Sequence, residues 1–249
     1  MKPKVGIIGA MAVEVESLKK KLLPLPGESG VNQIKTSSLC FTQGLLQGVE
    51  VVIVQSGVGK VNAALCAQNL ILKFNVTHII NTGIAGAIGS GLKVLDFVVS
   101  KDALYHDVDA TGFGYKKCEV PQLGVREFEA DKNLIECVKS AFSRLDADIK
   151  ETHCLTEGRI ATGDQFISDR KQKEQIKLDC NPSCVEMEGA AIAHACYLNK
   201  IPFVIIRCLS DMADDVSENT YSFNEETAAN LSASLVEKTI NEFGGLYEI

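Results

Sequence analysis

Short apolar runs alternate with segments of helical periodicity along the chain. Runs rich in β-branched residues, each bounded by turn residues, predict six strands: Val5–Ile8, Val51–Val54, His78–Asn81, Phe97–Ser100, Gly158–Ala161 and Phe203–Cys208. Apolar spacing between these runs predicts five helices: Ala12–Leu22, Lys60–Phe74, Lys132–Leu145, Gly189–Leu198 and Glu225–Phe243. Near-continuous apolar strands suit a sheet that is covered on both faces. The alternation therefore predicts an α/β fold with helices flanking a central, mostly parallel sheet.

No linker interrupts this pattern. The 249 residues include 6 Pro and 20 dispersed Gly, and no Ser/Gly-rich or charge-block segment divides them. We therefore expect a single domain over residues 1–249. Tyr105–Gln122 lacks periodicity and contains Gly112, Gly114 and Pro121, which predicts a long loop. Loops of this length in compact domains are usually functional or interfacial.

The composition excludes several classes of protein. Hydrophobic residues make up 46% and charged residues 23%, which is typical of a soluble globular chain and not of a disordered one. The 25 Lys and Arg against 32 Asp and Glu give a net charge of −7, so we expect no nucleic-acid partner. No apolar run approaches the ~18 residues of a membrane helix, so we expect no membrane partner.

The nine cysteines form no CxxC motif, and an odd number cannot pair completely within one chain. Cys66 and Cys208 lie in apolar segments, which favours reduced thiols used as small core residues. This use of cysteine predicts a cytoplasmic protein. No spacing of His, Cys and Asp fits a metal site.

Two glycine clusters each follow a predicted strand and precede a helix or turn. They are Ser56-Gly-Val-Gly-Lys60 and Thr82-Gly-Ile-Ala-Gly86, and neither completes a P-loop or a dinucleotide-binding fingerprint. The absent fingerprint argues against a dehydrogenase. Backbone N–H groups at such turns can hold a ligand oxygen, although ordinary strand-to-helix turns also explain both clusters.

Acidic residues gather near predicted strand ends. Glu14 follows the first strand, Glu186 and Glu188 precede a helix of small residues, and Asp211 ends the most apolar strand. Sites in open α/β sheets form at the carboxyl ends of strands, so these acids predict one cluster. Each acid taken singly is also explained as a helix N-cap or a solvated side chain.

Read together, the motifs resemble the purine nucleoside phosphorylase superfamily and, within it, the 5′-methylthioadenosine/S-adenosylhomocysteine nucleosidases. The resemblance runs from Lys4 to about residue 240. The segments that carry it, in chain order, are Gly6–Glu14, Ser56–Asn62, Ile80–Gly86, Tyr105–Asp107, Gly112–Tyr115, Gly163–Ile167, Val185–Glu188 and Arg207–Asp211. It implies a three-layer α/β/α fold, hydrolysis of a purine N-glycosidic bond, and no metal or organic cofactor.

The resemblance also assigns residues. Glu14 matches the acid that activates the attacking water, and Asp211 matches the acid that protonates purine N7. Glu188 matches the carboxylate that holds the ribose 2′- and 3′-hydroxyls. The other implied substrate contacts are Met187 at the sugar, Phe166 stacked on the purine, Ile167 at the adenine edge, Ala85, Gly86 and Ser210 around the base, and Tyr221 (or Phe223) as an aromatic lid.

The implied partners are a small adenine nucleoside and a second copy of the chain. Phe113, Tyr115 and Pro121 match a loop that closes the 5′-substituent pocket of the neighbouring subunit in a homodimer. One position departs from the family, because Ile84 stands where Ser is common. This exchange removes a hydroxyl near the attacking water, so its effect on rate and substrate range is open, as is the preferred 5′-substituent.

Two rival functions share this fold. A nucleoside phosphorylase needs an anion site, usually with Arg, whereas the first turn here carries Glu14 and no Arg precedes Arg126. A carboxylate at that turn would repel phosphate, which favours water as the nucleophile. A nucleoside-binding protein without turnover is the other alternative, and Ile84 is the reason to consider it.

Overall fold

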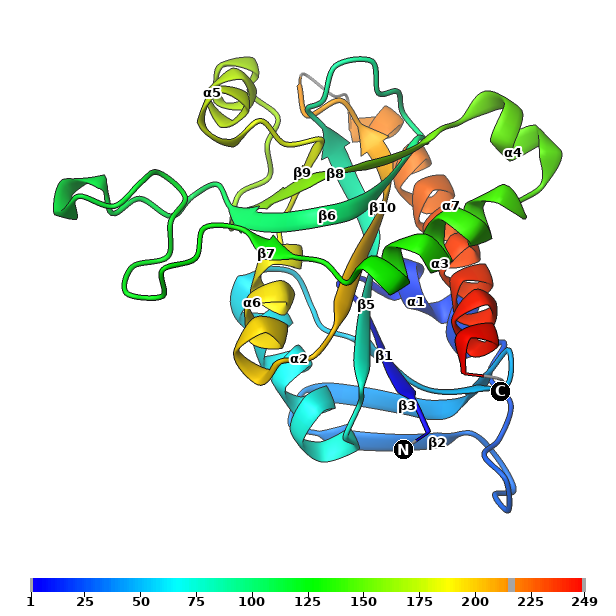
Figure 1. The fold of residues 1–249 in the computed structure, drawn as a ribbon. Helices are drawn as coiled ribbons and strands as arrows, with labels where there is room; N and C mark the ends of the chain where they lie inside the picture. The colour runs from blue at the N-terminus through cyan, green and yellow to red at the C-terminus, as the bar shows by residue number, and fades with distance from the viewer. Residues whose placement is uncertain (1, 215–217, 248–249) are drawn as a thin grey trace.

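The computed structural model describes residues 2–214 and 218–247, and for 218–223 it describes the helix without the side chains. The strands are β1 (Lys4–Gly9), β2 (Asn32–Thr36), β3 (Leu39–Leu46), β4 (Val49–Gln55), β5 (His78–Ala87), β6 (Phe97–Tyr105), β7 (Phe128–Glu129), β8 (Leu155–Thr162), β9 (Cys184–Glu186) and β10 (Phe203–Asp211). The helices are α1 (Ala12–Lys19), α2 (Lys60–Phe74), α3 (Lys132–Ser143), α4 (Ala147–Thr152), α5 (Arg170–Cys180), α6 (Gly189–Asn199) and α7 (Glu218–Leu246), with a 3₁₀ turn η1 (Thr111–Phe113) (Figure 1).

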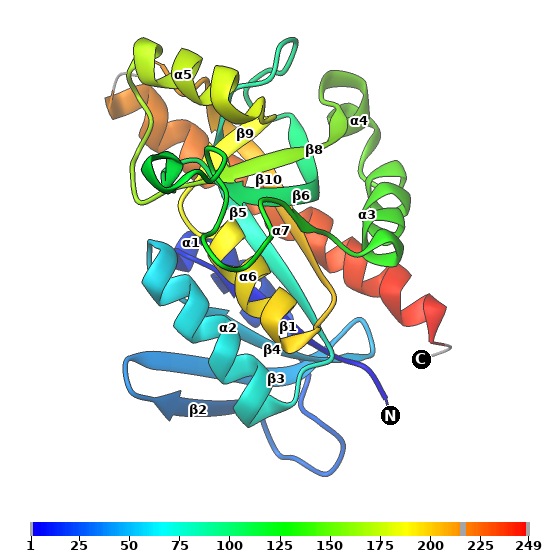
Figure 2. The same cartoon turned by 60° about the vertical axis from the view of Figure 1, so that its left-hand side comes forward.

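One mixed sheet connects all the described strands. Its order is β10-β6-β8-β9-β5-β1-β4-β3-β2, with β7 paired to β6. β1 runs parallel to both β4 and β5, and β10 runs parallel to β5. Because β10 pairs with β6 as well as β5, the strands β5, β9, β8, β6 and β10 close on themselves (Figure 2).

Helices cover both sides of this sheet, as Figures 1 and 2 show. α7 packs against β5 and β10 and also contacts α1 and α3, while α2 and α6 pack against each other on the opposite side. The central strands β4 and β10 are buried almost throughout, which explains their continuous apolar sequences. The α/β architecture with a mixed sheet flanked by helices is thus confirmed.

The six predicted strands and five predicted helices are all present. The strands extend further than predicted, and α2 has the predicted bounds. The sequence analysis missed β2, β3, β7 and β9, together with α4 and α5.

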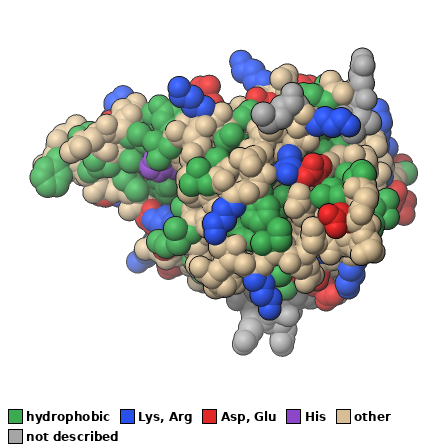
Figure 3. Space-filling model, turned by 90° about the horizontal axis from the view of Figure 1, so that it is seen from below, with side chains coloured by type: hydrophobic (Ala, Val, Ile, Leu, Met, Phe, Trp, Pro, Cys, Tyr) green, Lys and Arg blue, Asp and Glu red, His purple; other side chains and the backbone are tan. Residues whose placement is uncertain are grey.

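The predicted long loop projects from the body of the molecule after β6 and carries η1 (Figure 1). Phe113 within it is 88% exposed. Figure 3 shows this projection from another side, with hydrophobic side chains at its end.

All nine cysteines are free thiols, and seven of them are buried. This agrees with the prediction that they serve as small core residues. Among the described residues, no helix combines the length and apolar character needed to cross a membrane.

Candidate active site

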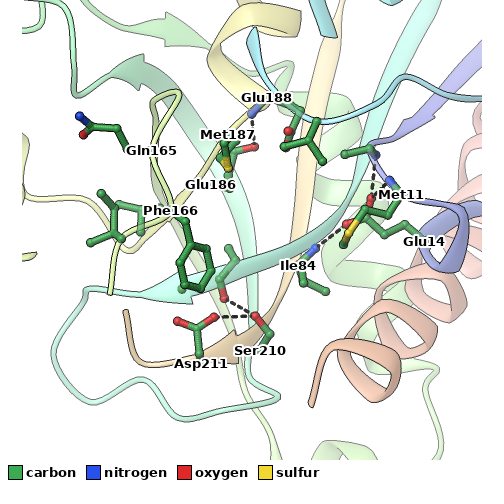
Figure 4. Close-up of a pocket in the computed structure, with 16 residues that line it drawn as sticks. Met11, Glu14, Ile84, Gln165, Phe166, Glu186, Met187, Glu188, Ser210 and Asp211 are labelled. Carbon is green, nitrogen blue, oxygen red and sulfur yellow. Dashed lines mark hydrogen bonds between the residues drawn. The ribbon is translucent and has the colours of Figure 1, made fainter. Parts of the chain in front are cut away.

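A pocket opens at the carboxyl ends of β1, β5 and β10. Four buried acids line it: Glu14, Glu186, Glu188 and Asp211. Figure 4 shows Asp211 at one side of the cavity and Glu14 at the other. The prediction that these acids form one cluster is confirmed.

Glu14 is fixed by backbone donors. It lies in the first turn of α1, and its Oε2 accepts the N–H groups of Ala10 at 2.7 Å and Met11 at 2.9 Å. Its Oε1 accepts the N–H of Ile84 at 3.1 Å. A side chain at Gly83 would collide with Oε1, so the close approach of β5 requires glycine there.

The pKa of Glu14 is raised from its ordinary value because burial outweighs the opposing effects of Arg207 and the three N–H donors. A carboxylate with a raised pKa is a better proton acceptor near neutral pH. The environment of Glu14 therefore suits a general base.

Asp211 is held at the end of β10 by two short hydrogen bonds. The Ser210 hydroxyl donates to Oδ2 at 2.7 Å, and the N–H of Ala213 donates to Oδ1 at 2.7 Å. A Cβ added at Gly86 would lie 2.9 Å from Oδ1, so this glycine leaves room for the carboxyl group. The side chain is thus buried and oriented at the pocket wall.

Glu188 is the N-cap residue of α6, but its side chain does not cap that helix. Its Oε1 accepts the N–H of Gly59 at 2.7 Å, from the turn before α2. Burial and the neighbouring Glu186 raise the pKa of Glu188 to about 8. Burial and the neighbouring carboxylate therefore oppose the ionisation of Glu188.

Comparisons with known proteins identify the family of the chain. A family model described as the Phosphorylase superfamily matches residues 4–241. A relative from Staphylococcus aureus, named 5′-methylthioadenosine/S-adenosylhomocysteine nucleosidase, is 42% identical over 239 residues, covering 96% of this chain and 99% of the relative. The chain belongs to this nucleosidase family.

Solved nucleosidase structures share the fold. One from Colwellia psychrerythraea, in complex with adenine, aligns with a TM-score of 0.89 at 40% identity and covers 97% of this chain and 96% of its own. One from Neisseria meningitidis, in complex with methylthio-immucillin-A, aligns with a TM-score of 0.87 at 37% identity and covers 96% and 98%.

The remaining residues that the nucleosidase resemblance singled out fall into two groups. Those that line the same pocket as Glu14 are Ala85, Gly86, Phe166, Ile167, Met187, Glu188, Ser210 and Asp211. Phe166 is 55% exposed at the pocket mouth, whereas Ile167 is buried.

The second group is not brought to this pocket in the structure of the single chain. Phe113 and Pro121 are exposed and Tyr115 is half-buried, all on the projecting loop. None of the three lines the pocket that the described residues form. The side chains of Tyr221 and Phe223 lie outside the described residues.

Glu186, which lines the pocket, and its ion-pair partner Arg207 received no individual role in the sequence analysis. Arg207 is buried within β10, and its Nη2 donates to Asn81 Oδ1 and to Glu186 Oε2, each at 2.5 Å. Burial opposes the charge of Arg207, yet Glu186 and Glu14 raise its pKa above the ordinary value. The sequence did contain a signal for this ion pair, namely a single Arg inside an otherwise apolar strand. A buried Arg is almost always paired, so its presence there indicates a buried acidic partner.

Proposed function

We propose that the chain hydrolyses the N-glycosidic bond of 5′-methylthioadenosine, S-adenosylhomocysteine and 5′-deoxyadenosine-type nucleosides. The products are adenine and the 5-substituted ribose. The observation that carries the proposal is the placement of Glu14 and Asp211 in one pocket, each held by its own set of donors.

Asp211 acts as the general acid. It donates a proton to purine N7, so that adenine leaves as a neutral molecule and the sugar gains oxocarbenium character. Water attacks the opposite face, and Glu14 accepts its proton. This is the division of labour of an inverting glycosidase, with two carboxyl groups in different protonation states on either side of a water.

Substrate recognition uses the rest of the pocket. Glu188 accepts the ribose 2′- and 3′-hydroxyls, and each charged hydrogen bond contributes about 1.5–3 kcal/mol. Met187 packs against the sugar, Phe166 stacks on the purine, and the backbone of Ile167 contacts the adenine edge. Ala85, Gly86 and Ser210 form the wall around the base.

A phosphorylase is disfavoured by the same geometry. The N–H groups of Ala10, Met11 and Ile84, which could hold an anion, already bind the Glu14 carboxylate. A phosphate there would meet like charge in a buried position. Mass spectrometry of the sugar product distinguishes the reactions, because hydrolysis yields the free sugar in phosphate-free buffer and phosphorolysis yields the 1-phosphate.

The proposal includes a homodimer of single-domain subunits in the cytoplasm, without nucleic-acid or membrane partners. The exposed side chains of Val61, Leu65 and Leu72 lie on α2, and those of Tyr197 and Leu198 on the adjoining α6. Apolar side chains gathered in this way favour a protein interface. In the dimer, the projecting loop with Phe113, Tyr115 and Pro121 completes the 5′-substituent pocket of the neighbouring subunit.

A further inference from the structure

Glu186 borders the active site, and four protein donors bind its carboxylate. Its Oε2 accepts the N–H of Glu188 at 3.0 Å, the N–H of Gly189 at 2.7 Å and Arg207 Nη2 at 2.5 Å. Its Oε1 accepts the Thr162 hydroxyl. Oε2 therefore has no acceptor position left for a substrate, and Oε1 already accepts one protein hydroxyl.

These bonds cap α6. The first N–H groups of a helix have no partner within the helix and are usually satisfied by the N-cap side chain. Here Glu186 binds two of them, and Thr162 Oγ1 accepts a third from Ala190 at 2.7 Å. The N-cap side chain, Glu188, is thereby released from capping and lines the pocket.

Three charged side chains and one backbone N–H act on Glu188. Glu186 from β9 and Glu14 from α1 oppose its ionisation, whereas Arg207 from β10 and the Gly59 N–H before α2 favour it. Arg207 forms its ion pair with Glu186 and not with Glu188. Glu186 therefore acts on Glu188 directly, through repulsion, and also by pairing with Arg207, whose charge favours the ionised form of Glu188.

We propose that Glu186 is a positioning residue for Glu188: it caps α6 in place of the Glu188 side chain, and its negative charge, paired with Arg207, governs how the Glu188 carboxyl binds the ribose diol. This inference rests on the proposed function for the role of Glu188.

The test measures binding, so that it does not depend on turnover. In an Asp211→Asn background, calorimetry gives the affinity for methylthioadenosine between about pH 6 and pH 9.5, which spans the ordinary and raised carboxyl range. We expect affinity to increase with pH around a midpoint near 8. Glu186→Gln should lower this midpoint by about one pH unit or more, because one repelling charge is lost and Arg207 is left free to favour ionisation.

Three controls accompany this variant. Glu174→Gln, at an exposed position on α5, should leave the midpoint unchanged. Glu186→Asp keeps the charge but shortens the side chain, so it should weaken binding several-fold without moving the midpoint. Adenine, which has no ribose, should bind without this pH dependence.

If Glu186→Gln lowers the thermal stability but leaves the pH midpoint of nucleoside binding unchanged, the role of Glu186 is purely structural and the inference is wrong. If Glu186→Gln does not fold, Glu186→Asp provides the test. A shifted pH midpoint of nucleoside binding in Glu186→Asp, or an unchanged affinity, would also contradict the inference. Failure of the unsubstituted chain to release adenine would contradict the proposed function instead, and the binding profile would still test Glu186.

Discussion

The backbone N–H of Ile84 donates to Glu14 Oε1 at 3.1 Å, while the Ile84 side chain lines the same pocket. The bond that fixes Glu14 therefore does not depend on the side chain at position 84. This separation makes position 84 suitable for changing the surroundings of the attacking water without displacing Glu14.

Ile84→Ser should raise kcat for methylthioadenosine roughly 2- to 10-fold, the effect of one hydrogen bond of about 0.5–1.5 kcal/mol to the attacking water. Ile84→Ala is the matched control, since it removes the apolar bulk without adding a hydroxyl. Steady-state kinetics of both variants provide the measurement. Equal rates for the Ser and Ala variants would contradict a role for the hydroxyl.

Asp211→Asn should lower kcat roughly 10²- to 10⁴-fold, the usual contribution of a general acid, while leaving nucleoside affinity largely intact. Asp214→Asn makes the same change of charge three residues later, where the side chain is nearly half exposed beside Lys173, and should retain activity. Adenine release and calorimetric binding test the pair. Near-normal turnover in Asp211→Asn would remove this residue from the mechanism.

The pKa of Glu188 gives a dependence of stability on pH. Its folded-state pKa of about 8 lies above the ordinary carboxyl value of 4.5. The folded chain therefore holds this proton more tightly than the unfolded chain does, and the stability present below the unfolded pKa is lost as pH rises through the folded pKa. Glu188→Gln should show a smaller fall in Tm between about pH 5 and pH 9 than the unsubstituted protein.

Thermal unfolding monitored by circular dichroism measures this difference. Glu237→Gln is a suitable control, because Glu237 lies far from the pocket and pairs with Lys21 at the surface. An identical pH dependence of Tm in Glu188→Gln and the unsubstituted protein would contradict the raised pKa.

Leu65→Asp should dissociate the proposed dimer. Leu65 is 58% exposed on α2, and burying an unpaired carboxylate in an interface costs about 3 kcal/mol or more, or at least about 100-fold in the dimer dissociation constant. Leu23→Asp places the same charge at another exposed leucine outside the α2 and α6 faces and should have no effect on assembly. Sedimentation equilibrium distinguishes the outcomes, and a concentration-independent monomer before substitution would refute the dimer.

The elements predicted from sequence are those whose burial is continuous or regularly spaced. β10 has a continuous apolar pattern because it is buried at every residue, and α2 has a regularly spaced one because one of its faces is buried. β2 is exposed along almost its whole length, and α5 is strongly polar, so neither leaves an apolar pattern to detect. The three-residue strand β9 is too short to show any periodicity.

Glu14 and Asp211 were predictable as neighbours because each follows a predicted strand, and the parallel strands β1, β5 and β10 end at the same edge. Glu186 ends β9 and Glu188 follows it, but the sequence analysis missed this strand, which runs antiparallel to β5. The division of labour between Glu186 and Glu188 was not predictable. It depends on Thr162 and Arg207, which are distant in sequence and meet Glu186 only through the closed arrangement of β8, β9 and β10. Such a network leaves no local signal in the chain.

Adenine release from methylthioadenosine in phosphate-free buffer is the most direct test of the account. We predict release of adenine and the free 5-methylthioribose at a rate that added phosphate does not increase, and its loss in both Glu14→Gln and Asp211→Asn. Strict dependence on phosphate, or tight binding of the nucleoside with no adenine released, would contradict it.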